Sequence, residues 1–523
     1  MGTIVTPNLA FYAESNGAAE SAYQVLLKNR EQGLIWADMA LTLITDTDYP
    51  GHHTYAVTSI TRSGTTATVT TTATNALETG DVVTIAGAAQ TDYNGDFTIT
   101  MTSGTTFTYT VANSPTTPAT GTITAYGGKT TVPGVVYLDG YFFVMDDKAR
   151  IWNSSLGDGT SWDALDFITA EKEPGGGVAI GKSQNYVIAL KEWSIEFFYD
   201  AANAVGSPLS PVESGFSLVG CASGESLANL DGLLMWVSQT RQKGRSVHLL
   251  DGMSPVQLST PDIERILNAD DLATVYSYGL KTSGHRFYVL TLVTSNITLV
   301  YDLGTKLWYE WSSLTLNGSS KSVSTMTRSD TTVTVTATAH GFSDGDPVLI
   351  AGANQSDYNG VKQIQYVDAD TFRFHVSSNQ ATTATGTITA TGYTESYFKF
   401  TKYVHSGGKD LVLHETDGHL YEISDTVFQD DGVPIDVVMR TPKLDGETTD
   451  NKTMAKVEVI GNKVSSHAMV RWSDDDYTTW TRFRLVDLSA SRSQVRRCGD
   501  YRRRAFEIRH NGNAAIQLAE LEI

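Results

Sequence analysis

Six arginines lie within fourteen residues near the end of this 523-residue chain. They are Arg496, Arg497, Arg502, Arg503, Arg504 and Arg509. A guanidinium group is planar and always charged, and its donors match the two oxygens of a carboxylate. This arginine-rich segment, residues 496–509, therefore predicts a surface that docks an acidic partner or a neighbouring subunit. Two other interpretations stay open: the arginines pair with the chain's own surplus of carboxylates, or they contact phosphate, which the acidic character of the whole chain disfavours.

A glycine-rich stretch could bind a nucleotide. Gly176–Ser183 matches the phosphate-binding pattern GxxxxGK[ST] at every position. That chemistry requires a strand before the motif and a helix after it, whose N-terminal amides hold the phosphates. The residues that follow, 184–190, are rich in strand formers and lie close to a turn. The motif therefore does not predict a nucleotide site.

Two acidic or histidine-rich clusters could hold a metal ion. His414 and His419 are five positions apart with Asp-Gly between them, which indicates a hairpin and not two ligands on one helical face. The run Asp474–Asp476 lacks the spaced oxygens and the glycine of a calcium loop, so a solvated turn is favoured. No nucleophile elbow or spaced acid/base pair is found. We therefore predict no catalytic residues, no cofactor and no metal site.

Composition excludes several classes of protein. The chain has 38 Lys and Arg against 58 Asp and Glu, a formal net charge of −20, whereas a protein that grips nucleic acid needs clustered cations. A hydrophobic content of 41% is enough to build cores. The two cysteines are too far apart in the sequence for a CxxC motif and too few for a disulfide scaffold. The first residues show no secretory signal, and no apolar stretch is long enough to span a membrane, so we expect the protein to accumulate in a reducing cytoplasm.

An internal repeat divides the chain. The sequence 80–88 returns as 345–353, and three further blocks, 92–95, 106–107 and 120–125, match at the same offset of 265 residues. Each copy is a module of about 70 residues, near 56–125 and 321–391. A third of the first copy is Thr, which alternates with apolar residues as in half-buried strands, and Asn94-Gly95 predicts a tight turn with positive φ. We expect two small β-barrels or sandwiches inserted into a larger body.

The larger body repeats a different pattern, in which an Asp-Gly or polar turn precedes a short aromatic and apolar strand. Examples are Asp139–Met145, Asp231–Val237 and His285–Leu292. Many such strands predict an all-β fold, and we favour an irregular β-propeller of five or six blades over a large sandwich. Only two helices are expected, over residues 18–30 and 261–267.

The changes of character along the chain predict six segments. The body comprises 1–55, which contains the first helix, together with 126–320 and 392–433; the modules are 56–125 and 321–391; and 434–523 is a β-rich region with the arginine-rich segment. In this last region, 502–509 and 515–523 are expected to form two paired strands.

Parts of the body resemble the packaged-DNA stabilisation proteins, or tail nozzle proteins, of short-tailed bacteriophages. The resemblance is carried by residues 178–199, Asp262–Leu267, Leu299–Asp302, Trp308–Trp311 and the arginine-rich end. It covers roughly 130–311 and 395–523 in the family's order. The two Thr-rich modules depart from the compact family pattern, and the segment before the first module is shorter than the family would lead one to expect.

The resemblance implies a non-enzymatic virion protein. It implies a propeller-based subunit of a hexameric ring, assembled in the host cytoplasm, that sits below the head-to-tail adaptor, extends the DNA channel and closes it. Its partners would be further copies of itself, the adaptor ring, and a tail needle, plug, fibre or spike. Double-stranded DNA would pass without specific binding, since an acidic conduit repels phosphates. The arginine-rich segment, 496–509, would then contact the adaptor or a neighbouring subunit.

A second interpretation takes the Thr-rich modules as adhesive domains. In that case the protein would be a receptor- or carbohydrate-binding tail adhesin, with exposed Trp and Tyr as sugar platforms. A third and weaker interpretation is a glycan-cleaving enzyme built on a propeller.

Overall fold

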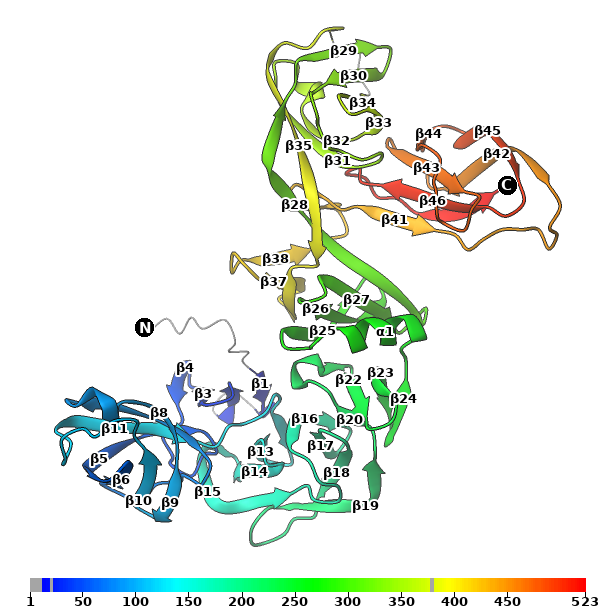
Figure 1. Ribbon diagram of the computed structural model, residues 1–523. Coiled ribbons are helices and arrows are strands. Elements are labelled where there is room, and N and C mark those ends of the chain that lie inside the picture. Colours follow the sequence, from blue (N-terminus) through cyan, green and yellow to red (C-terminus); the bar gives the residue numbers. More distant parts are fainter. Residues whose placement is uncertain (1–11, 19–21, 377–380) are drawn as a thin grey trace. The chain divides into compact units, whose positions relative to one another are not determined.

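The computed structural model describes residues 12–18, 22–376 and 381–523. Strands dominate these residues, and the only α-helix among them is α1 (Pro261–Ala269). The predicted all-β fold is therefore confirmed, as is the expected helix at 261–267. The chain divides into two compact units (Figure 1). The first comprises residues 1–280, 286–295 and 301–306, and the second comprises 281–285, 296–300 and 307–523.

The body of the first unit contains four antiparallel sheets in which most strands pair with the next one along the chain. Their strands are β1 (Tyr12–Ser15), β2 (Val25–Lys28), β3 (Gly33–Ala37) and β4 (Ala40–Leu43); β12 (Val136–Leu138), β13 (Tyr141–Met145), β14 (Arg150–Ser155) and β15 (Asp158–Thr169); β16 (Gly177–Ser183), β17 (Tyr186–Lys191), β18 (Ile195–Asp200) and β19 (Leu209–Ser217); and β20 (Gly220–Cys221), β21 (Ala228–Leu230), β22 (Leu233–Thr240), β23 (Gly244–Asp251) and β24 (Ser254–Gln257). Strands β25 (Val275–Thr282), β26 (His285–Leu292) and β27 (Ile297–Asp302) follow α1. Such meanders are typical of propeller blades.

Aspartate-glycine turns set the register of these sheets. Asp139 and Gly140 have φ of 48° and 100°, and Asp231 and Gly232 have φ of 57° and 80°. Positive φ at both central residues is the geometry of the two-residue hairpin turn that suits the twist of paired strands. Each turn is closed by a strand pair, Leu138 with Tyr141 in the first case.

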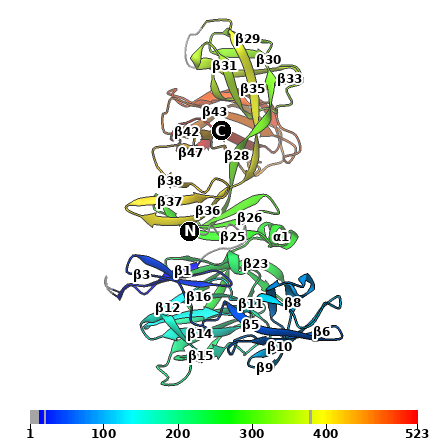
Figure 2. The ribbon, with the colours of Figure 1, turned by 90° about the vertical axis from the view of Figure 1, so that its left-hand side faces the viewer.

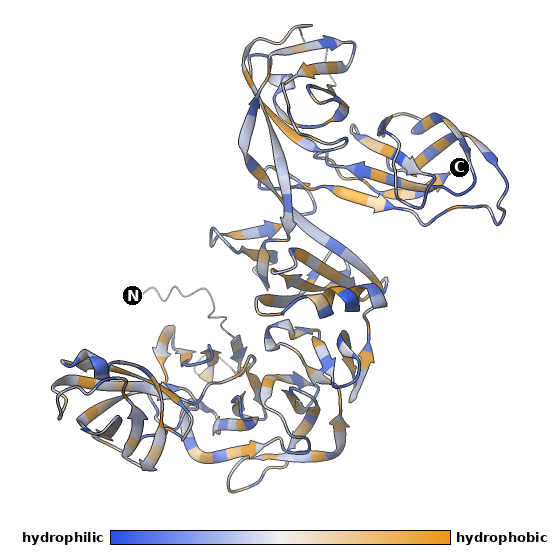
Figure 3. Ribbon diagram, viewed as in Figure 1, coloured by the Kyte–Doolittle hydropathy of each residue, from blue (hydrophilic) through white to orange (hydrophobic). Residues whose placement is uncertain are grey.

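Successive sheets pack face to face through apolar cores. One core joins the sheet of β1–β4 to that of β12–β15 and includes Leu26 and Trp152. The next joins β12–β15 to β16–β19 around Phe143, and a third joins β16–β19 to β20–β24 around Trp236. The central strands are buried on both faces, so they are apolar almost throughout (Figure 3).

The first Thr-rich module is one curved sheet of seven strands, in the order β8-β7-β11-β5-β6-β10-β9. The strands are β5 (His52–Ser63), β6 (Thr66–Thr71), β7 (Val82–Ala88), β8 (Gly95–Thr98), β9 (Thr100–Ser103), β10 (Thr106–Thr110) and β11 (Gly121–Gly128). The first strand pairs with the last, His52 opposite Gly128. The chain therefore enters and leaves the module at one place, which is how an insertion into a single loop is accommodated.

The second module repeats this arrangement in the second unit. Its strands are β28 (Leu307–Ser322), β29 (Thr325–Ser329), β30 (Thr332–Thr336), β31 (Pro347–Ala353), β32 (Gly360–Gln363), β33 (Gln365–Asp368), β34 (Thr371–His375) and β35 (Gly386–Tyr397). Here β28-β35-β31-β32 lie in one sheet and β29-β30-β34-β33 form another (Figure 2). In place of the single long strand β5, the chain has β28 and β29, which pair with β35 and β30 in the two sheets.

Two local expectations for the first unit were wrong. The predicted helix over 18–30 includes residues 19–21, which lie outside the described residues, but Val25–Lys28 forms strand β2, because it pairs with β1 and β3. Asn94 does not have positive φ: it follows a 3-10 turn at φ −86°, and only Gly95, at 134°, does. The Asn94 side chain instead accepts the backbone N–H of Ala88 at 2.9 Å through Oδ1 and donates to the Ala88 carbonyl at 2.8 Å through Nδ2.

The C-terminal region is a sandwich of two antiparallel sheets, β41-β46-β43-β44 and β45-β42-β47. The strands are β41 (Val437–Arg440), β42 (Lys452–Gly461), β43 (His467–Ser473), β44 (Arg484–Asp487), β45 (Gln494–Tyr501), β46 (Ala505–His510) and β47 (Leu518–Glu522). The sheets enclose a core that includes Val457, Trp472 and Phe506. The expectation that 502–509 pairs with 515–523 was wrong, because β46 pairs with β41 and β43 whereas β47 pairs with β42 in the opposite sheet.

Between the second module and the sandwich lie five short strands of the second unit. A three-stranded sheet contains β36 (Phe400–Ser406), β37 (Lys409–His414) and β38 (Leu420–Ile423), and a two-stranded one contains β39 (Gln429–Asp430) and β40 (Val433–Pro434).

Candidate docking surface

The arginine-rich segment runs along β45, which is the edge strand of one sheet of the sandwich, through the turn after it, and along β46, which lies between β41 and β43 in the other sheet. The sandwich, residues 434–523, contains 15 Lys and Arg against 13 Asp and Glu, whereas the rest of the chain contains 23 against 45. The region is thus slightly cationic in a strongly acidic protein. The structure divides the six arginines into two groups, those with carboxylate partners and those without.

Arg504 is a structural residue of the sandwich. Its side chain is 1% exposed, and its Nε and Nη2 donate to the two oxygens of Asp474 at 2.7 and 2.8 Å. Its Nη1 donates to the carbonyl of Cys498 at 2.7 Å, and the guanidinium stacks on Trp472 at 5.0 Å. A buried charge is tolerated only when it is paired and hydrogen-bonded, and this one is both.

Arg509 connects the sandwich to the second module. Its Nη1 donates to the carbonyl of Gly345 at 3.1 Å and lies 4.0 Å from Asp346, and its Nε lies 3.4 Å from Asp436. Burial raises the pKa of Asp436 to about 6, although the charge of Arg509 acts in the opposite direction. Arg509 therefore serves an internal contact.

The remaining four arginines are exposed. Arg503 lies 3.2 Å from Asp476 in a surface ion pair. Arg496, Arg497 and Arg502 have no carboxylate partner among the residues that the structure describes. Arg497 lies at a bulge of β45 with φ of 58°, and Arg484 donates to the carbonyls of Arg496 and Arg497 at 2.8 and 3.1 Å. The backbone that carries the unpaired arginines is thus held in place, and these three arginines are the candidates for docking that remain.

A second charged cluster in the sandwich was not predicted from the sequence. Glu507 is fully buried, and Arg440 and Arg471 each approach its carboxylate to 2.7 Å. Arg471 also stacks on Trp480 and Phe483, at 4.9 and 4.4 Å. Three strands bring these groups together, so no spacing in the sequence announces them. The aromatic residues that flank the acidic turn at 474–476 were the only available signal.

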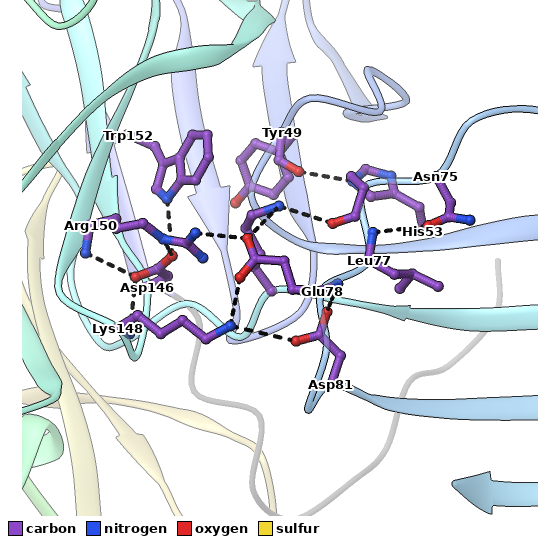
Figure 4. A network of polar contacts seen from close by, with 12 residues as sticks. Tyr49, His53, Asn75, Leu77, Glu78, Asp81, Asp146, Lys148, Arg150 and Trp152 are labelled. Carbon is purple, nitrogen blue, oxygen red and sulfur yellow. Dashed lines mark hydrogen bonds and ion pairs between the residues drawn. The ribbon is translucent and has the colours of Figure 1, made fainter. Parts of the chain in front are cut away.

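The first module docks onto the body through the corner Glu78–Asp81 (Figure 4). Lys148 Nζ donates to Glu78 Oε2 at 2.6 Å, and Arg150 Nη1 donates to Glu78 Oε1 at 2.7 Å. Lys129 lies 3.7 Å from Glu78, and Lys148 lies 3.8 Å from Asp81. Burial would raise the pKa of Glu78, but the hydrogen bonds from Arg150 and Lys148 outweigh it and lower that pKa to about 2.

The body side of this contact is itself organised by a buried carboxylate. Asp146 accepts hydrogen bonds from Arg150 Nε at 2.6 Å and from Trp152 Nε1 at 3.2 Å (Figure 4). It also accepts the backbone N–H groups of Lys148 and Arg150, at 3.0 and 2.9 Å. Asp146 thereby orients the two cations that receive Glu78.

The second module uses the equivalent corner, Ser343–Asp346, for a different contact. The backbone N–H of Ser343 donates to Asp346 Oδ2 at 2.7 Å, as the backbone N–H of Glu78 donates to Asp81 Oδ2 at 2.8 Å in the first module. Asp344 Oδ2 accepts the backbone N–H of Phe483 in the sandwich at 2.7 Å. The same repeated loop therefore docks each module onto its neighbour in the fold.

The other motifs have structural roles. Gly177–Ser183 is strand β16, and Tyr186–Lys191 after it is strand β17, so the context of a nucleotide loop is absent there. His414 and His419 flank the turn of a hairpin, 3.2 and 3.7 Å from Asp417. No group of three or more side chains able to hold a metal ion occurs in the described part of the chain. Over the same ranges, no helix combines the length and apolarity that a bilayer crossing requires.

Comparison with known proteins identifies one family. The family model described as bacteriophage P22 Gp10, beta-propeller, matches residues 62–322. This range contains most of the first module and the strands from β12 to β28, but not the sandwich. The resemblance seen in the sequence over 395–523 thus lies outside the match. No curated protein matches the chain.

Solved structures give only remote likenesses. The computationally designed Ika8 protein is 12% identical, covering 78% of this chain and 93% of its own, with a TM-score of 0.25. BamB from Moraxella catarrhalis is 12% identical, and the match covers 65% of this chain and 98% of BamB, with a TM-score of 0.25. The endosialidase of phage phi92 is 11% identical, and the match covers 94% of this chain and 76% of the endosialidase, with a TM-score of 0.17. At TM-scores this low, these structures indicate neither the fold nor the function of this chain.

Proposed function

Because the chain belongs, through residues 62–322, to the family of bacteriophage P22 Gp10, beta-propeller, we propose that this structural phage tail protein is the nozzle subunit of a short-tailed phage. Copies of the chain form a ring, with six as the expected number. The ring lies below the head-to-tail adaptor, extends the DNA channel and closes it until the genome is ejected. The subunit is assembled in the host cytoplasm and has no catalytic role.

The family match carries this proposal, and the distribution of charge supports it. Outside the sandwich the chain has 23 Lys and Arg against 45 Asp and Glu. A surface of this charge repels the phosphate backbone, so DNA passes without being retained. The unpaired arginines Arg496, Arg497 and Arg502 lie on the sandwich, where they are available to a protein partner instead. The adaptor ring, a neighbouring subunit, and a tail needle, plug, fibre or spike are the partners that we propose.

Electron microscopy of the purified full-length protein, alone and with the adaptor ring, tests this function. We expect closed rings with a central channel, stacked on the adaptor when it is present. In the same preparation, double-stranded DNA at low salt should show no retardation in a gel. A protein that stays monomeric at all concentrations and never joins the adaptor would contradict the proposal. So would tight DNA binding that weakens steeply with salt, because that dependence marks several phosphate contacts.

A further inference from the structure

A groove of about 560 Å³ lies on the first unit, between two neighbouring sheets of the body. Asp139 lines it from the turn between β12 and β13, and Tyr186 from the start of β17. Tyr199 and Asp200, at the end of β18, and Glu213, in β19, also line it, as does Asn185 in the turn before β17. Three carboxylates and two tyrosine rings thus face one hollow.

The carboxylates of this groove have no cationic partner among the described residues. Asp200 accepts the backbone N–H of Ala202, at 2.6 Å. Lys172 lies beside the groove, but its Nζ donates to the backbone carbonyls of Val212 and Glu213 at 2.8 and 3.0 Å. The charge of the groove is therefore uncompensated. Carboxylates next to aromatic faces are the surroundings that a guanidinium group prefers, since it bonds the former and stacks on the latter.

The complementary surface lies on the sandwich of the same chain. Arg496, Arg497 and Arg502 are exposed and unpaired, as described above. Arg496 and Arg502 are six positions apart along and just beyond β45, which corresponds to about 20 Å of extended strand. Such a row of cations is long enough to reach several carboxylates at once.

We propose that the groove, defined by Asp139, Tyr186, Tyr199, Asp200 and Glu213, receives the arginines Arg496, Arg497 and Arg502 of a second copy of this chain. The contact is heterologous, because two different surfaces meet and each copy keeps one of each free. Repetition of such a contact closes a ring when its rotation permits. The inference rests on the proposed ring function and names the surfaces that would build it.

Charge reversal with mixing tests this pairing. One variant reverses the groove (Asp139→Lys, Asp200→Lys and Glu213→Lys), and a second reverses the arginines with Arg496→Glu, Arg497→Glu and Arg502→Glu. Mass photometry and sedimentation at low salt measure assembly. Each variant alone should assemble at least tenfold more weakly than the wild type, whereas an equimolar mixture should recover assembly. In the mixture, copies alternate, so every contact again joins opposite charges.

A control variant loses three exposed carboxylates of the first unit that lie away from the groove, through Asp38→Asn, Asp96→Asn and Asp251→Asn. This variant should assemble as the wild type does. A neutral groove variant (Asp139→Asn, Asp200→Asn and Glu213→Gln) replaces the reversed one if that one fails to fold; it should weaken assembly as well.

The outcomes separate this inference from the proposed function. If the wild type forms rings and both reversed variants do too, the pairing is wrong and the ring function stands. If assembly returns only when both reversals are placed in one chain and not on mixing, the contact is within one copy, and a second copy is not the occupant. If the wild type forms no rings, alone or with the adaptor, both the inference and the proposed function fail.

Discussion

The Arg504 guanidinium holds Asp474 through two hydrogen bonds of 2.7 and 2.8 Å, and the arginine is 1% exposed where the aspartate is 39% exposed. Two positions away, Asp476 pairs with Arg503 and Lys443, and all three side chains are well exposed. One short acidic turn thus contains a carboxylate that balances a buried charge and another that makes only surface ion pairs.

This difference predicts unequal effects of removing the two charges. Asp474→Asn leaves a buried guanidinium without its counter-ion and should lower the free energy of unfolding by about 2–3 kcal/mol. Asp476→Asn removes only exposed pairs and should cost less than about 1 kcal/mol. Urea unfolding followed by Trp fluorescence measures both. Equal effects of the two substitutions would show that the bidentate pair does not stabilise the sandwich.

Docking of the first module should weaken in acid. The pKa of Glu78 is lowered to about 2 in the folded protein, from an ordinary value of 4.5. Folding therefore favours the ionised carboxylate, so its stabilising effect is complete above about pH 4.5 and is lost as the pH falls towards 2. Thermal unfolding between pH 2 and 7 should show this loss in the wild type and a smaller dependence in Glu78→Gln.

Asp96→Asn is the control for that series, because Asp96 lies in the same module, accepts a hydrogen bond from Thr84, and has no cationic partner within the described ranges of the chain. It should keep the acid dependence of the wild type. A Glu78→Gln variant whose melting temperature follows the wild type at every pH would contradict the assigned role of Glu78.

The repeat provides a matched pair of glycines. Gly80 and Gly345 occupy the same corner with φ of 99° and 89°. A Cβ on Gly80 would meet nothing within 4 Å, whereas one on Gly345 would lie 2.5 Å from the ring of Phe483. Both Ala substitutions introduce the strain of positive φ, about 1 kcal/mol or more, but Gly345→Ala must also displace the sandwich contact.

We therefore expect Gly345→Ala to lower the unfolding temperature more than Gly80→Ala does, and to increase proteolytic cleavage between the second module and the sandwich. Chemical denaturation and limited trypsin digestion of both variants measure this. If the two substitutions are equivalent in both assays, the Phe483 contact does not fix the second module.

Removal of the first module should leave the body intact. A Cβ on Gly128 would clash with the carbonyl oxygen of Gly51, so the two ends of the module meet. A variant in which a short Gly-Ser turn replaces residues 52–127 should form rings as the full chain does, by electron microscopy. Phage that carry this variant should adsorb less well only if the module is adhesive. Failure of the variant to assemble would show that the module belongs to the ring.

Several features of the fold follow from local sequence. Alternating Thr and Val in the modules, and Asp-Gly before apolar strands in the body, predict strands and turns because their physical basis lies within a few residues. The repeat at an offset of 265 predicted two copies of one unit without reference to its fold. Residues 25–28 show the limit, since pairing with β1 and β3 overrides the local preference for helix.

The roles of the arginines were decided by the tertiary structure. The sequence determined that six cations gather near the end of an acidic chain, and it left open whether they serve a partner or the chain itself. Arg502, Arg503 and Arg504 are adjacent and chemically identical, yet only Arg504 is buried. Its burial depends on which strand and turn face it across the sandwich, and Asp474, its partner, is thirty residues away. A charge pairs with whatever carboxylate the fold brings within hydrogen-bonding distance, and that distance is not a property of the sequence nearby.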